Sequence, residues 1–128
     1  MRPPRFKLVV REWEYRSQAK SETRIQVEGK TVGVVSPDIY HDHGGMSIWR
    51  AEAEQREHLY PLIVEAESQI EAAENLVICL TALGDLTPEP EPVNLWQNEI
   101  FQRVLELIGE GAPRYQIEKA IQDAFVHG

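Results

Sequence analysis

The sequence predicts an α+β protein, in which an N-terminal antiparallel β-sheet is followed by helices. Apolar and polar residues alternate through the N-terminal third of the chain, as they do in half-buried strands. Helical spacing of apolar residues then begins after residue 50. Strands and helices that occupy separate parts of a chain are typical of the α+β class. A length of 128 residues fits one domain.

Residues 1–50 are expected to form the sheet. The alternating pattern predicts four strands, the last of them short: residues 6–15, 23–28, 30–35 and 46–50. Residues 16–22 are polar and are expected to form a loop. Gly29 can adopt the positive φ that a tight hairpin needs. The sequence therefore predicts an antiparallel meander of three to four strands.

Residues 51–84 are predicted to form one long helix, which Pro61 kinks or breaks because it removes a backbone hydrogen bond. Gly84 is suited to the left-handed cap at its end. Apolar residues recur there at spacings of four and three: Leu59, Ile63, Ala66, Ile70, Ala73, Val77 and Leu80. Such a stripe fits a helix packed on the sheet. The same repeat fits a coiled coil, so a homodimer formed through the long helix is the alternative.

The last part of the chain is predicted to be a linker followed by two helices. Residues 85–93 are rich in Pro and Glu, which favours an extended connector. Residues 94–128 are expected to form a helical hairpin, with Asn94 as the cap of the first helix. Gly109 ends that helix, and Pro113 suits the start of the second.

The charge of the chain is unevenly distributed. The formal net charge is −8, and residues 57–102 contain nine Asp or Glu but no Lys or Arg. Negative charge repels the phosphates of nucleic acids, so nucleic acid is not an expected partner. A protein with a basic surface is the expected partner, because complementary charge steers association.

The sequence is therefore interpreted as a non-enzymatic protein-interaction module or inhibitor, of the kind encoded by phages and other mobile elements. It is expected to bind a basic macromolecular partner through an acidic helical face, without a cofactor and without catalytic residues. The residues expected to contact the partner are all glutamates of the central segment and the linker: Glu65, Glu67, Glu71, Glu74, Glu89 and Glu91.

Two alternatives rest on short patterns. His41-Asp42-His43 combines two imidazoles with a carboxylate, which suits zinc or another transition metal. The alternative function is a small metal-dependent enzyme or metal-binding protein that uses His41 and His43. The third is a DNA-binding regulator that uses the two C-terminal helices, with Arg114 and Lys119 facing the DNA.

The location is expected to be cytoplasmic, with no contact with a membrane. The N-terminus lacks the apolar core of a signal peptide, and no uncharged run approaches the roughly 20 residues that span a bilayer. Cys79 is the single cysteine and excludes an intrachain disulfide. Its apolar neighbours predict a packed structural thiol.

Overall fold

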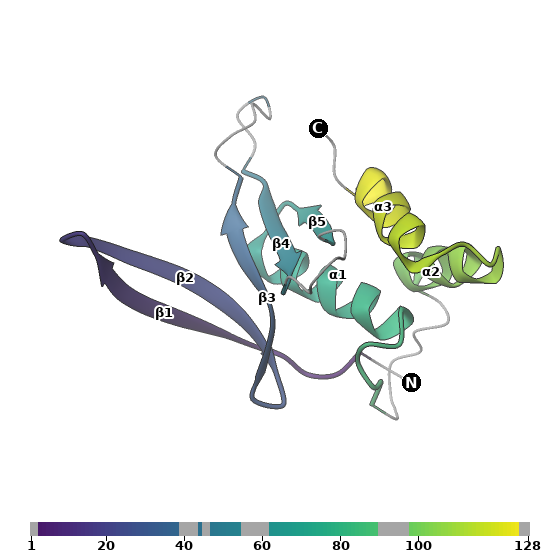
Figure 1. Ribbon diagram of the computed structural model, residues 1–128, viewed down its shortest axis with the longest axis horizontal. Helices are drawn as coiled ribbons and strands as arrows, with labels where there is room; N and C mark the ends of the chain where they lie inside the picture. The colour runs from purple at the N-terminus through teal and green to yellow at the C-terminus, as the bar shows by residue number, and fades with distance from the viewer. Residues whose placement is uncertain (1–2, 39–43, 45–46, 55–61, 90–97, 126–128) are drawn as a thin grey trace.

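The computed structural model describes residues 3–38, 44, 47–54, 62–89 and 98–125. Within these ranges, a five-stranded antiparallel sheet is followed by three helices (Figure 1), so the predicted α+β class is confirmed. The strands are β1 (Lys7–Tyr15), β2 (Gln18–Val27), β3 (Lys30–Pro37), β4 (Trp49–Ala53) and β5 (Ile63–Ala66). Each strand pairs with the next along the chain, which makes the sheet a simple meander.

Two tight turns connect the first three strands. Arg16 and Ser17 have φ of 49° and 60°, and Glu28 and Gly29 have φ of 52° and 79°. Positive φ at both central residues is the signature of the type I′ hairpin turn. The prediction for Gly29 is confirmed. The loop predicted at residues 16–22 is confirmed only at residues 16 and 17, which form the turn. It is wrong for residues 18–22, whose polar side chains belong to the start of β2.

The long helix predicted over residues 51–84 is wrong in its first half. Trp49–Ala53 and Ile63–Ala66 are strands, and only Gln69–Ala82 is helical, as α1. In β5, a short buried strand places apolar residues on consecutive positions, and this run imitates one turn of a helix. In β4, the Ala and Glu residues favour a helix, but pairing with β3 and β5 overrides that preference. The predicted kink or break at Pro61 lies outside the described residues. The predicted fourth strand also ends three residues later than expected, at Ala53.

The helix ends follow local signals. The Ser68 side chain accepts the backbone N–H of Glu71 at 3.1 Å and starts α1, and Gly84 follows its end with φ of 86°, as predicted. The Asn98 side chain, rather than that of Asn94, caps α2 (Glu99–Gly109); Asn94 lies outside the described residues. The helix α3 (Arg114–Phe125) follows Pro113. Among the described residues, no helix is long and apolar enough to cross a membrane.

The core lies between the inner face of the sheet and α1, with α2 and α3 completing it (Figure 1). Fully buried side chains from every layer meet there: Ile25, Val35, Val64, Leu76, Val77, Val104 and Ile121. The predicted stripe residues Ala73, Val77 and Leu80 of α1 are buried within the chain itself. Two α1 helices could therefore not pair through this stripe without opening the core.

The Leu76 side chain of α1 packs closely on the sheet at Gly33 of β3. A Cβ atom at this position would lie 2.5 Å from the carbonyl oxygen of Glu52 and 2.7 Å from Cδ2 of Leu76. Both distances are well below van der Waals contact. Glycine is therefore required where α1 crosses β3 and β4.

We expect Gly33→Ala to lower the free energy of unfolding by about 2 kcal/mol, because the added methyl group displaces either the β4 backbone or α1. Chemical denaturation measures the change. Gly109→Ala is the matched control, because a Cβ there meets no atom within 4 Å. Helix propensity predicts that this control is neutral or slightly stabilising. Equal losses in the two variants would contradict the close approach at Gly33.

Candidate functional site

Two of the six predicted partner-binding glutamates are paired within the chain. The Glu65 side chain on β5 is only 7% exposed, and its Oε1 lies 3.7 Å from Nε of Arg50. Glu89 accepts the backbone N–H of Arg5 at 3.4 Å, and its other oxygen lies 4.0 Å from Nε of that arginine. These two carboxylates hold the fold together locally. Glu91 lies outside the described residues.

Three of the predicted residues lie close together at the start of α1. Glu67 lies in the turn before the helix, Glu71 in its first turn and Glu74 one turn further, and all three are exposed. We call this surface the acidic end of α1. Within the described part of the chain, none of the three forms an ion pair with a Lys or Arg. The positive end of the helix macrodipole favours negative charge at this place.

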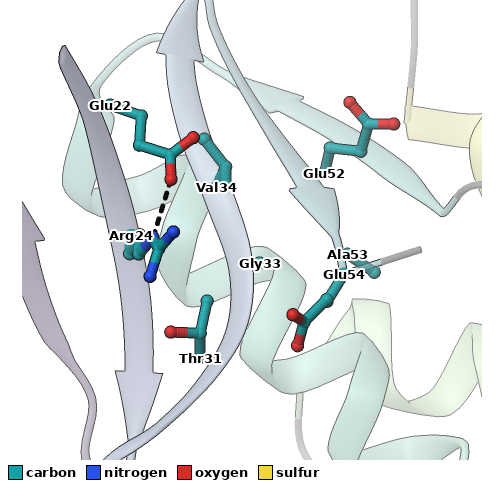
Figure 2. A pocket seen from close by; sticks show the side chains of 8 residues that line it. All are labelled: Glu22, Arg24, Thr31, Gly33, Val34, Glu52, Ala53 and Glu54. Atoms are coloured by element: carbon teal, nitrogen blue, oxygen red, sulfur yellow. Dashed lines mark hydrogen bonds and ion pairs between the residues drawn. The ribbon is translucent and has the colours of Figure 1, made fainter. Parts of the chain in front are cut away.

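A second acidic surface lies on the outer face of the sheet, opposite α1. A hollow of about 300 Å³ lies between β2, β3 and β4. Figure 2 shows the residues that line it: Glu22, Arg24, Thr31, Gly33, Val34, Glu52, Ala53 and Glu54. Arg24 donates from Nε to Glu22 at 2.7 Å, which neutralises that carboxylate. The carboxylates of Glu52 and Glu54 extend from β4 on the other side of the hollow (Figure 2). The excess of carboxylates favours a cationic group over an anion there.

The structure shows a further surface that the sequence interpretation did not identify. We call the segment from residue 9 to residue 21 the β1–β2 ribbon, because it extends beyond the helices (Figure 1) and every residue in it is exposed. It carries four of the large apolar side chains that the described residues expose: Val9, Val10, Trp13 and Tyr15. Arg11 lies 5.7 Å from the ring centre of Trp13, and Arg16 lies 5.3 Å from that of Tyr15. Exposed apolar surface of this kind is typical of contact sites.

The ribbon could have been identified from one signal in the sequence. Apolar side chains occur on both phases of the alternation in β1, with Leu8 and Val10 on one phase and Val9, Trp13 and Tyr15 on the other. A surface strand of a monomer normally has one polar face. The register with β2 continues without a break from Lys7 to Tyr15, so both faces are presented by a regular strand.

Arg114, predicted to face DNA in the third alternative, is already paired within the chain. Its guanidinium donates to Oδ2 of Asp85 at 2.5 Å and to Oε1 of Glu118 at 2.7 Å. Burial alone lowers the pKa of Arg114, but the hydrogen bonds and negative charges of Asp85 and Glu118 outweigh it, so the pKa is raised above its usual value. The three side chains tie the start of α3 to the end of α1.

Two predicted sites remain to be located: the thiol of Cys79 and the histidine pair His41 and His43. Cys79 is buried, and burial raises the pKa of its thiol to about 12. A thiol in this state is not a nucleophile at neutral pH, as the sequence predicted. His41 and His43 lie outside the described residues. Within the part that is described, no three His, Cys, Asp or Glu side chains lie close enough to hold a metal ion.

We expect Arg114→Met to lower the free energy of unfolding by about 3 kcal/mol, because it leaves two enclosed carboxylates without their shared cation. The side chains of Asp85 and Glu118 are only 12% and 5% exposed. Thermal and denaturant unfolding measure the loss. The control is Arg103→Met, which removes an ion pair to Glu106 whose two side chains are 58% and 65% exposed. Loss of such a surface pair costs at most about 1 kcal/mol. A loss for Arg114→Met no larger than that of the control would contradict this assignment.

No family model, no curated protein and no solved structure matches the chain. The acidic end of α1, the outer hollow and the β1–β2 ribbon are therefore assigned from their own geometry and charge.

Proposed function

We propose that this chain is a non-enzymatic protein-interaction module that binds a protein with a basic surface through the acidic end of α1. The supporting observation is the exposure of Glu67, Glu71 and Glu74 next to one another without an intrachain cation in the described part. Most surfaces mix charges of both signs. The segment 57–102, which contains this end of α1, has no Lys or Arg at all.

The proposed contact uses fewer glutamates than the six that the sequence suggested. Glu65 and Glu89 are left out of the proposed contact, because Arg50 and Arg5 already neutralise them. The three remaining carboxylates can accept charge-assisted hydrogen bonds from Lys or Arg side chains of the partner. Exposed pairs contribute little affinity each, so their main effect is on the rate of association and on its dependence on salt.

An inhibitory role is part of this proposal. A partner whose basic surface normally contacts nucleic acid would lose that contact while the acidic end of α1 covers it. The proposed encounter takes place in the cytoplasm, which is consistent with a single cysteine that is buried as a thiol. The metal-binding alternative stays a prediction of the sequence, since His41 and His43 lie outside the described residues.

We expect the triple reversal Glu67→Lys, Glu71→Lys and Glu74→Lys to slow association with the partner by about tenfold or more at low salt. The partner is first captured from the native host and identified by mass spectrometry. Association rates are then measured with the purified partner at two salt concentrations, about 50 mM and about 500 mM. High salt screens the charges, so the wild type and the triple variant are expected to converge there.

The matched control reverses three exposed carboxylates elsewhere, Glu28→Lys, Glu110→Lys and Asp123→Lys, and so changes the net charge by the same amount. This control is expected to retain most of the association rate. If the control slows association as much as the triple variant, net charge rather than the acidic end of α1 governs binding. If neither variant slows it, the proposed surface is wrong.

A further inference from the structure

The two edges of the sheet differ in how they are covered. At one edge, β5 is short and α3 packs against it. At the other edge, β1 is nine residues long and pairs with β2 on one side (Figure 1), and among the described residues no strand pairs with its other side. A long exposed edge strand presents a row of backbone groups that can pair with another strand. Natural proteins usually shorten, bend or cover such an edge.

The turn at Arg16 and Ser17 determines which backbone groups of β1 face outward. In a two-residue hairpin, the flanking pair Tyr15–Gln18 is hydrogen-bonded, and bonded pairs then recur at every second residue. Odd-numbered residues of β1 therefore bond to β2. The even-numbered residues direct their N–H and C=O groups to the open side: Leu8, Val10, Glu12 and Glu14.

We propose that β1 pairs antiparallel with β1 of a second copy, about a two-fold axis at Val10. The two five-stranded sheets then become one continuous sheet. Leu8, Val10 and Glu12 of each copy would form about six backbone hydrogen bonds across the axis. The proposal does not rest on the proposed function, because the acidic end of α1 takes no part in it.

The charges on β1 select this register. A two-fold axis perpendicular to the sheet keeps each side chain on its own face, so only residues of the same alternation phase can lie opposite one another. Five such registers pair at least five residues of β1. Their axes lie at five consecutive residues: Val9, Val10, Arg11, Glu12 and Trp13.

Four of these registers place like charges directly opposite, which destabilises a strand pair. An axis at Val9 opposes Lys7 and Arg11, and an axis at Arg11 opposes that residue to itself. An axis at Glu12 opposes two Glu12 side chains, and an axis at Trp13 opposes Glu12 and Glu14. The axis at Val10 avoids every like-charge pair.

The selected register also places the most exposed apolar residue of β1 opposite its own copy. Val10, which is 60% exposed, lies opposite Val10 of the second copy. Val9 lies opposite Arg11, and Lys7 lies opposite Trp13, where a cation can rest on the indole ring. Among the described residues, β1 is the open edge and α3 packs against β5 at the other edge, so the proposed association closes at two copies and does not continue into a fibre.

The test uses two substitutions at neighbouring exposed residues of the full chain. Val10→Glu places two carboxylates opposite each other at the axis, and we expect it to weaken dimerisation by about tenfold or more. Val9→Glu places a carboxylate opposite Arg11 of the second copy, and we expect it to tighten dimerisation. Sedimentation equilibrium over a range of concentrations gives the dissociation constant of each form.

A cross-linking experiment tests the register independently. Under mild oxidation, Val10→Cys is expected to form a disulfide-linked dimer, because residues that lie opposite in a strand pair are within the range of a disulfide. Val9→Cys is the control, because its two copies are offset along the strands and are expected to remain unlinked. Cys79 is buried and does not compete.

The proposal is overturned by any of three results: a wild type that stays monomeric at every concentration, species larger than a dimer, or dissociation constants that shift in the same direction for Val10→Glu and Val9→Glu. Equal cross-linking of the two cysteine variants would refute the register. A monomeric wild type whose ribbon binds a different protein would likewise exclude a second copy as the occupant. None of these results bears on the triple reversal at the start of α1, so the two proposals fail separately.

Discussion

The packing of α1 on the inner face of the sheet at Gly33 is the contact on which the rest of the structure depends. A methyl group at Gly33 does not fit between the Glu52 carbonyl oxygen of β4 and the Leu76 side chain of α1. One side of α1 then covers the sheet, and other side chains of the helix pack against α2. A 14-residue helix is about 21 Å long. It therefore covers only part of a sheet whose first strands are about 30 Å long.

The surfaces available for function follow from this difference in length. The end of the β1–β2 hairpin extends past α1, so its apolar residues stay exposed on both faces. A two-stranded ribbon is marginally stable alone, and pairing along β1 would add strands on its open side. If both proposals hold, the dimer presents two acidic ends of α1. When such a dimer binds a partner with two basic surfaces, the first contact holds the second acidic end close to its own target. The dimer is therefore expected to bind that partner more tightly than one chain does.

The fold class and several element ends could be predicted because local signals encode them. Gly29 and Gly84 adopt positive φ where the sequence required it. The two strands β4 and β5 could not be assigned in this way. The apolar run of β5 also fits one helical turn, and the Ala and Glu residues of β4 favour a helix. Ser68 and Glu71 have the spacing of a capping box, and this local signal marks the true start of α1.

The candidate site was predictable only in part, because it depends on tertiary pairing. The sequence shows which residues are acidic, but Arg50 reaches Glu65 only through the pairing of β4 with β5. Arg5 likewise approaches Glu89 across a separation of 84 residues. Glu67, Glu71 and Glu74 have no ion pair among the described residues, because the fold brings none of the described Lys or Arg side chains to the start of α1. The open edge of β1 depends on the position of a strand within the sheet, which alternation alone does not give.

Amide hydrogen exchange along β1, measured by NMR at low and high protein concentration, tests the central claim that this strand is an open edge for a second copy. At low concentration, the N–H groups of Val9, Arg11 and Trp13 are expected to exchange slowly, and those of Leu8, Val10 and Glu12 rapidly. At high concentration, the second set is expected to become protected. Rapid exchange of the second set at every concentration would contradict the claim.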